Sequence, residues 1–161
     1  MNNVFRYAGM TALVLWIVTI GVLGFMFVKG KTVISDDGRT GIVLQENERD
    51  FVLTEMRDLL ASINGIITSL AKDDYPAAAQ WARKVGLKGH NTIEAQNPTI
   101  MAKLPIGFKQ MGMSLHKDFD EVADMIDKKM SQKEILGRMG ETTSKCISCH
   151  STFKLVTQDK K

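Results

Sequence analysis

Hydrophobic residues in this chain form one unbroken run near the N-terminus and then several periodic stripes. The run, from Tyr7 to Val28, contains no charged residue and is flanked by Arg6 on one side and by Lys29 and Lys31 on the other. At about 1.5 Å per residue, a helix of this length spans a hydrocarbon layer of about 30 Å. The pattern predicts an N-terminal transmembrane anchor over residues 1–28.

A secretory signal peptide is the alternative interpretation of this run. Signal peptides have a shorter apolar segment, of about 7–15 residues, followed by a cleavage site of small residues. The sequence after Val28 reads Lys-Gly-Lys-Thr-Val-Ile-Ser and has no Ala-x-Ala pattern. We therefore favour a retained anchor over a removed signal peptide.

Residues 29–45 form a connector between this run and the stripes. Two short segments, Thr32–Ile34 and Gly41–Leu44, flank the turn signal Ser35–Arg39. The pattern fits a small hairpin, and it fits a flexible tether equally well. Either structure would hold the following domain close to a membrane surface.

From residue 46 onward, apolar residues recur every three or four positions, which is the period of a helix that buries one face. We expect four helices in a domain over residues 46–161: near 46–72, 76–86, 105–128 and from about 131 through Phe153. The stripes of the first, third and fourth helices are Val52, Met56, Leu59, Ile63, Ile66 and Leu70; Phe108, Gly112, Leu115, Phe119, Val122 and Ile126; and Ile135, Met139, Thr142, Cys146, Cys149 and Phe153.

Two helix starts have local signals. Asp74 and Pro76 indicate entry to the short second helix, because a proline in the first turn lacks an N–H that would stay unbonded there. Ser131 and Glu134 fit a capping box at the start of the last helix. Residues 90–103 predict a loop with one or two short turns. Four acidic residues of the third helix predict its solvated face: Asp118, Asp120, Glu121 and Asp124.

Helices joined by short links predict an all-α fold, an antiparallel four-helix bundle preceded by one transmembrane helix. The chain has 161 residues and is 44% apolar, which suits one small domain and an anchor. The net charge is +3, and basic residues are spread among acidic ones. The sequence therefore excludes nucleic acid from the expected partners.

The strongest chemical signal is Cys146-Ile147-Ser148-Cys149-His150, because Cys-x-x-Cys-His is the attachment signature of a c-type haem. Two cysteines three positions apart lie on one side of a helical turn, so both can form thioethers to one porphyrin. The adjacent histidine can bind the iron. Both cysteines also lie on the predicted buried stripe, so an attached cofactor would lie inside the bundle.

Three other interpretations of the motif stay open. A redox-active disulfide usually lies at a helix N-terminus in a βαβ setting, whereas this pair comes late in a predicted helix. A structural zinc site needs four ligands, and the remaining histidines, His90 and His116, lack the spacing of a second pair. The third interpretation is that the motif occurs by chance and has no function.

The motif near the end of the final helix of a chain of this size resembles the class II c-type cytochromes, the cytochrome c prime family. Phe153 and Lys154, three and four positions after His150, also resemble the close of that family, and the resemblance extends over about residues 46–158. It implies a four-helix bundle with one covalent haem c near the C-terminus. The N-terminal anchor departs from the soluble periplasmic members.

The resemblance implies that a residue of the first helix covers the iron opposite His150. That residue is a methionine ligand in electron-transfer members and an apolar side chain in gas-binding members. Met56 is the candidate here, because a thioether is a soft ligand that stabilises ferrous haem. The alternative is an ordinary core methionine, since the chain has ten. Other candidates are His116, expected at a solvent boundary, His90, Met111, Met113 and Met139, or no ligand, with Leu59 or Leu60 over the iron.

Two residues after the motif complete the candidate site. Phe153 is expected to pack against the porphyrin edge or to fill the core. Lys154 is expected to pair with a haem propionate, or to be solvated near the helix end. The expected cofactor-binding residues are thus Cys146, Cys149, His150, Met56, Phe153 and Lys154, with His150 and Met56 on the metal.

The function predicted from these features is single-electron transfer by a membrane-anchored monohaem cytochrome that is not itself an enzyme. Its expected partners are periplasmic or membrane redox proteins, such as a respiratory or photosynthetic membrane complex, and the lipid bilayer. Bundles of this family often form dimers, so a second copy of the chain is a further expected partner. Because c-type haem is attached outside the cytoplasmic membrane, we expect a single-pass protein of the bacterial inner membrane with a periplasmic haem domain. The alternatives are a five-coordinate cytochrome c prime that binds nitric oxide or another small gas, and a haem-free Cys-x-x-Cys redox protein.

Overall fold

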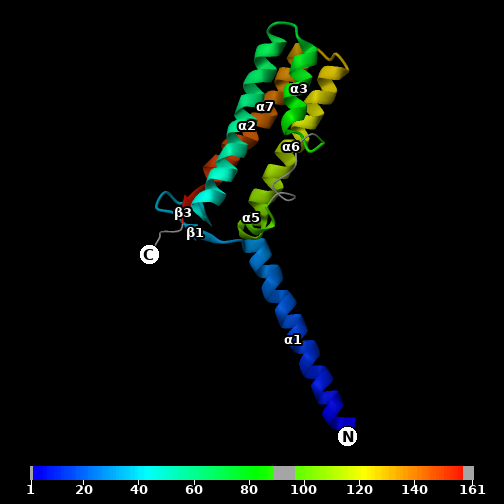
Figure 1. Ribbon diagram of the computed structural model, residues 1–161, viewed down its shortest axis with the longest axis vertical. Helices are drawn as coiled ribbons and strands as arrows, with labels where there is room; N and C mark the ends of the chain where they lie inside the picture. The colour runs from blue at the N-terminus through cyan, green and yellow to red at the C-terminus, as the bar shows by residue number, and fades with distance from the viewer. Residues whose placement is uncertain (1, 89–96, 158–161) are drawn as a thin grey trace.

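The computed structural model describes residues 2–88 and 97–157, and this part of the chain is mostly helical (Figure 1). Its helices are α1 (Asn2–Lys29), α2 (Glu46–Leu70), α3 (Tyr75–Val85), α5 (Pro98–Lys103), α6 (Ile106–Asp127) and α7 (Gln132–Thr152). Its strands are β1 (Thr32–Ile34), β2 (Thr40–Leu44) and β3 (Phe153–Thr157).

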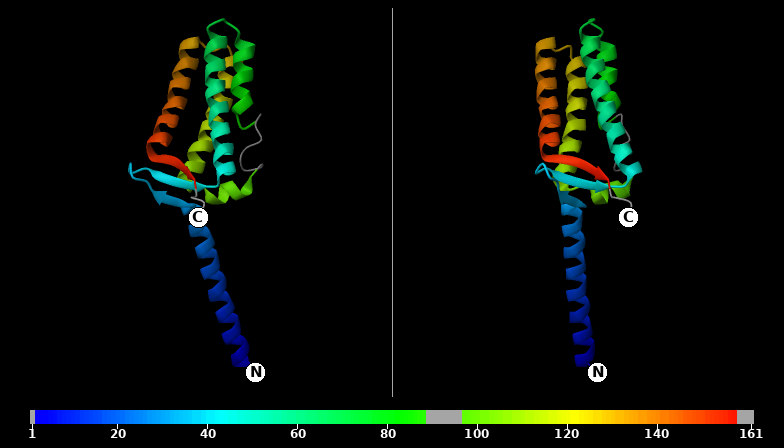
Figure 2. Two further views of the ribbon diagram at one scale, coloured as in Figure 1. Left: turned by 60° about the vertical axis from the view of Figure 1, so that its left-hand side comes forward. Right: turned by 90° about the vertical axis from the view of Figure 1, so that its left-hand side faces the viewer.

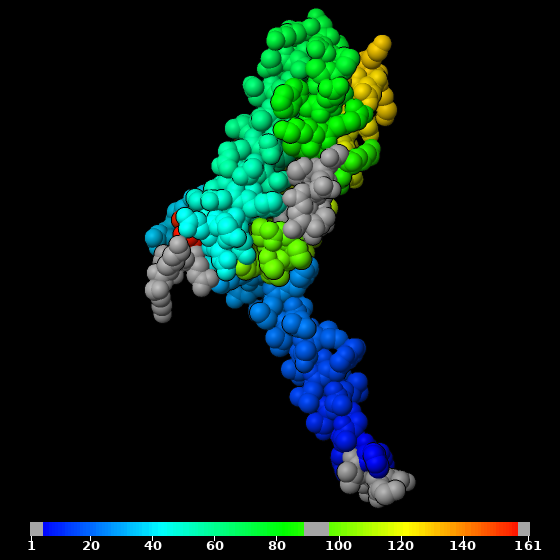
Figure 3. Space-filling view, in the orientation of Figure 1, coloured from blue at the N-terminus to red at the C-terminus, as the bar shows by residue number. Residues whose placement is uncertain are grey.

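Helix α1 extends away from the rest of the molecule as a single exposed rod (Figure 3). Among the described residues it is the one helix long and apolar enough to cross a membrane, over Phe5–Lys29, with a mean hydropathy of 2.4. None of that stretch is buried against the rest of the chain. The predicted apolar N-terminal helix is therefore confirmed.

The connector after α1 is an ordered hairpin. Strands β1 and β2 pair antiparallel, with Thr32 opposite Ile42 and Ile34 opposite Thr40. Gly38 closes the turn with a φ of 79°, a left-handed conformation that glycine adopts without steric cost. Of the two structures that the sequence left open, the hairpin is thus the one formed.

The sheet has a third strand that the sequence analysis did not anticipate. The last helix was predicted to run through Phe153, but α7 ends at Thr152 and Phe153 begins β3 with extended backbone angles. Strand β3 lies parallel to β2, with Thr40 opposite Phe153. The all-α expectation is therefore incomplete, because the chain ends its helical region by pairing with the hairpin.

Helices α2, α3, α6 and α7 lie side by side along a common direction, with the sheet across their end nearest α1 (Figure 2). Helix α2 packs on α3, α3 on α6, and α6 on α7. All four contribute to the main core, which contains Ile66, Leu70, Ala78, Ala79, Ala82, Val85, Leu115, Phe119, Val122, Ala123, Ile126, Ile135 and Met139. A second, smaller core lies near the sheet and contains Ile42, Leu44, Val52, Ile100 and Leu104.

The helix starts follow their local signals. Asp74 accepts a hydrogen bond from the backbone N–H of Ala77 at 3.0 Å, with Pro76 in the first turn of α3. Ser131 and Glu134 form the predicted capping box of α7. Both predictions are confirmed, because a cap depends on residues that are close in the sequence.

The expected solvated face of α6 is partly wrong. Asp118 and Asp120 are buried, whereas the side chains of Glu121 and Asp124 are about half exposed. Asp118 is paired with Arg138 of α7, and Asp120 accepts a hydrogen bond from the backbone N–H of Lys88 at 3.3 Å. Carboxylates with such partners can be buried, and the sequence pattern of one helix does not reveal them.

Candidate functional site

The end of α7 carries the Cys-x-x-Cys-His motif. Cys146 is half-buried and packs against the main core, while Cys149, one turn later, lines a pocket together with His150. Both thiols are free. Burial raises the pKa of the Cys146 thiol, and burial together with the neighbouring Cys146 raises the pKa of Cys149. Unligated, both groups are therefore protonated thiols at neutral pH.

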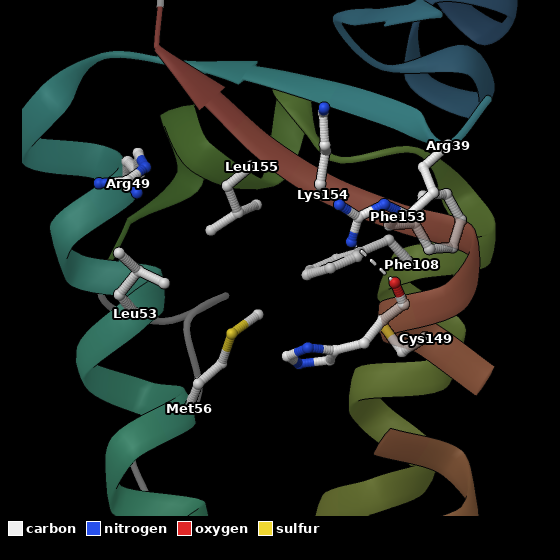
Figure 4. Close-up of a pocket in the computed structure, with 10 residues that line it drawn as sticks. Arg39, Arg49, Leu53, Met56, Phe108, Cys149, Phe153, Lys154 and Leu155 are labelled. Atoms are coloured by element: carbon white, nitrogen blue, oxygen red, sulfur yellow. Dashed lines mark hydrogen bonds between the residues drawn. The ribbon is translucent and has the colours of Figure 1, made fainter. Parts of the chain in front are cut away.

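The pocket lies between α2 and α7 and is closed at one end by β3 (Figure 4). It has a cavity volume of about 180 Å³, or about 540 Å³ of empty space with its open side included. Its lining comes from the hairpin, α2, α6, α7 and β3: Arg39, Arg49, Leu53, Met56, Phe108, Cys149, His150, Phe153, Lys154 and Leu155.

Met56 reaches into this pocket from α2, and Cys149 lies on the opposite wall (Figure 4). Met56 is half-buried and packs against the second core, so its side chain is held at the pocket wall. The structure thus brings five of the six predicted site residues to one pocket, and the sixth, Cys146, lies one helical turn behind it.

The other candidate axial ligands lie elsewhere or outside the described residues. His116 was expected at a solvent boundary, but it is buried, and its Nδ1 is 2.6 Å from the carbonyl oxygen of Val85. Met139 and Leu59 pack in or against the main core, and Leu60 is 66% exposed. Met111 and Met113 do not belong to the lining of this pocket. His90 lies outside the described residues.

Phe153 and Lys154 reach the pocket through strand β3 rather than through a helix. The ring of Phe153 meets that of Phe108 edge to face, with centroids 5.6 Å apart and an interplanar angle of 87°. Lys154 Nζ lies 3.4 Å from Asp37 Oδ2 at the tip of the hairpin. The two residues thus form an apolar wall and a polar rim of the pocket.

Sequence reasoning missed the two arginines of the pocket. Arg39 comes from the hairpin turn and Arg49 from the first turn of α2. The side chain of Arg39 bonds to Asp37 at 2.7 and 2.9 Å, and its Nη1 donates to the carbonyl oxygen of His150 at 3.0 Å. These hydrogen bonds from Arg39 lower the pKa of Asp37 to about 2. For strand β3, the available signal was the strand-forming run Leu155–Thr157, which begins five residues after His150.

The residues 2–88 and 97–157 contain no cluster of three or more His, Cys, Asp or Glu side chains suited to a metal ion. The four ligands of a structural zinc site are therefore not assembled in this part of the chain. What the site does assemble is two thiols, an imidazole, a thioether, apolar walls and three cationic side chains.

Comparisons with protein-family models, with curated proteins and with solved structures give no match to this chain.

Proposed function

We propose that the protein is a membrane-anchored monohaem c-type cytochrome that carries single electrons between redox partners and is not itself an enzyme. The observation that carries the proposal is the pocket between α2 and α7. Cys149 and His150 of the attachment motif line it, and so does Met56, which the sequence singled out as the sixth ligand.

The groups around the pocket suit a covalently attached haem. Cys146 and Cys149 would form the two thioethers, His150 would take one axial position of the iron, and Met56 would take the other. The side chains of Leu53, Phe108, Phe153 and Leu155 offer the apolar contact that a porphyrin requires. Three cations around the pocket suit the two propionate carboxylates: Arg39, Arg49 and Lys154.

A bound haem supplies a one-electron ferric–ferrous couple, and the residues of this chain set its properties. His150 on α7 and Met56 on α2 would hold the iron in both oxidation states, so little reorganisation would accompany electron transfer. The soft thioether of Met56 favours the ferrous state. As a ligand, Met56 would also keep small gases from the iron.

We also propose a four-helix bundle for the haem domain and a location at the bacterial inner membrane. Helices α2, α3, α6 and α7 would form an antiparallel four-helix bundle similar to that of the class II cytochromes, and their shared core supports this. Helix α1 would span the membrane. Since c-type haem is attached outside the cytoplasmic membrane, the haem domain would face the periplasm from the bacterial inner membrane. Its partners would be membrane or periplasmic redox proteins.

Two measurements on protein isolated from membranes test the proposal. The protein is produced in cells with a working haem-maturation system. The intact mass is expected to equal that of the full chain plus one haem, with the N-terminus retained. The reduced pyridine haemochrome spectrum is expected to be that of a haem with two thioether links. A colourless protein with the mass of the polypeptide alone would refute the cytochrome, and loss of the apolar N-terminus would refute the anchor.

A further inference from the structure

The hairpin that follows α1 is bonded to both sides of the molecule. On the side of α1, the backbone N–H of Lys31 donates to the carbonyl oxygen of Lys103 at 2.7 Å, and that of Val43 donates to Lys31 at 2.8 Å. On the other side, β2 pairs with β3, whose first residue is the third after His150. The connector is therefore a structural bridge between the membrane helix and the end of the haem-attachment motif.

Arg39, in the hairpin turn directly before β2, makes a polar contact between this bridge and the motif. Its Nη1 donates to the carbonyl oxygen of His150 at 3.0 Å. Its Nε and Nη2 donate to Asp37 Oδ2 at 2.9 and 2.7 Å, and its backbone N–H donates to Asp37 Oδ1 at 3.2 Å. The guanidinium is thus held in one orientation by a neighbouring carboxylate before it reaches the motif.

The contact lies where a helix end needs a partner. The last carbonyl groups of an α-helix accept no hydrogen bond from within the helix. A cation at that end also interacts favourably with the helix dipole. His150 stands in the last turn of α7, so its carbonyl is one of these groups. By bonding it, Arg39 fixes the backbone from which the imidazole projects and also places a permanent positive charge at the pocket.

We propose that Arg39 is a positioning residue for the axial ligand His150, and that it couples the membrane-side hairpin to the coordination geometry of the iron. This inference rests on the proposed function. It assigns two effects to one side chain. The hydrogen bond to the carbonyl oxygen sets the orientation of the imidazole, and the charge favours the reduced state, which carries one positive charge fewer than the oxidised state.

The two effects are separable by substitution in the full-length, haem-loaded protein. Arg39→Gln removes the charge and the paired donors. Arg39→Lys keeps the charge and loses the planar fork. Arg57→Gln is the control for the loss of a positive charge, because Arg57 lies on α2 outside the lining of the pocket and its Nη2 donates to Thr54 Oγ1 at 2.7 Å. Haem content is measured first, then the midpoint potential, then the electron paramagnetic resonance spectrum of the ferric form, which reports axial-ligand orientation.

We expect both Arg39 variants to shift the ferric resonance spectrum and the Arg57→Gln spectrum to stay as in the wild type. At a fixed electrode potential, the ratio of reduced to oxidised protein is expected to fall about two- to fivefold in Arg39→Gln, the size of one charge effect at a helix terminus. Arg39→Lys should keep most of that ratio.

The outcomes separate this inference from the proposed function. A wild type without haem refutes the cytochrome itself. A haem-loaded protein whose spectrum is unchanged in both Arg39 variants refutes positioning, even where the midpoint potential shifts, since a shift of the potential alone reports charge. If Arg39→Gln fails to accumulate, Arg39→Lys carries the same spectroscopic test.

Discussion

Met56 and Cys149 line opposite walls of one pocket, the first from the first half of α2 and the second from the end of α7. Helix α2 packs mainly on α3 and helix α7 on α6, and the pocket between α2 and α7 is lined by both side chains. A thioether on one wall and a thiol with an adjacent imidazole on the other are the groups that a six-coordinate c-type haem requires.

The first prediction concerns the sixth ligand. If Met56 holds the iron as proposed, replacing it with alanine should turn a low-spin ferric spectrum into a high-spin one, because the iron would lose a strong ligand. Carbon monoxide should then bind rapidly to the reduced variant. Leu53→Ala is the matched control, since Leu53 lines the same pocket from the same helix and carries no ligand atom. It should leave the protein low-spin.

Rapid binding of carbon monoxide by the wild type would contradict ligation by Met56. The protein would then be better described by the gas-binding alternative, in which the face of the iron opposite His150 carries no ligand. The same titration therefore decides between the two haem functions that the sequence suggested.

The helices and their starts could be predicted because their signals are local. A capping box such as Ser131–Glu134 and a proline after Asp74 act through neighbours in the sequence, and an apolar stripe reports burial of one face. Met56 could be proposed as a pocket residue on the same basis, because it lies on such a stripe and the family resemblance named the first helix.

The sheet and the cationic rim could not be predicted because their partners are distant in the sequence. Strand β3 forms by pairing with β2. Arg39 and His150 are in contact in the fold but lie 111 positions apart in the sequence. The burial of Asp118 has the same cause, since its partner lies on the next helix along the chain. No periodic pattern within one segment reports a contact of this kind.

The second prediction concerns the ion pairs between α6 and α7. Asp118 Oδ1 accepts a hydrogen bond from Arg138 Nη2 at 2.6 Å. Its Oδ2 accepts no hydrogen bond and lies 2.6 Å from Lys145 Nζ, a charge contact alone. The Asp118 side chain is 4% exposed, so Asp118→Asn should destabilise the fold by about 3 kcal/mol, the lower end for breaking a buried ion pair. Chemical denaturation of the full chain measures this loss.

Glu121→Gln is the control for that loss. Glu121 also accepts from Arg138, at 2.8 Å, but its side chain is 46% exposed. Exposed ion pairs contribute about 0–1 kcal/mol, so the control should lose less than about 1 kcal/mol. Equal losses in the two variants would show that burial of Asp118 does not decide the energy of this contact.

The third prediction concerns the junction between α1 and the domain. Gly30 has a φ of 65°, and a Cβ built on it would lie 2.5 Å from the carbonyl oxygen of Lys103 and 2.6 Å from the backbone nitrogen of Pro105. Because both of these atoms belong to the backbone, the clash in Gly30→Ala cannot be relieved by a side-chain rotation. The left-handed conformation alone costs an alanine about 1–2 kcal/mol.

Trypsin cleavage at the neighbouring Lys29 and Lys31 measures this effect. In Gly30→Ala, cleavage should become about tenfold faster, because it follows the population of the opened junction when opening and closing are fast. Gly137→Ala is the control, since a Cβ there meets nothing within 4 Å in the middle of α7. That change should leave cleavage unaltered and the helix slightly more stable. Unchanged cleavage in Gly30→Ala would mean that the junction is not closed in solution.

The last prediction concerns acid. Hydrogen bonds from Arg39 lower the pKa of Asp37 from 3.8 to about 2 in the folded chain. A carboxyl whose pKa is lowered by folding contributes stability above its unfolded pKa and loses that contribution as the pH falls toward the folded value. The difference in melting temperature between wild type and Asp37→Asn should therefore be constant above about pH 5 and should shrink between about pH 4 and pH 2.

The charge on Asp37 is solvent-exposed, so its contribution should be small and should decrease further in high salt. Asp36→Asn is the control, because it removes the same charge from the same turn while the bonds between Asp37 and Arg39 remain. A difference between wild type and Asp37→Asn that stays constant down to pH 2 would show that Arg39 does not hold Asp37 ionised. The guanidinium would then lack the carboxylate that orients it toward the carbonyl oxygen of His150.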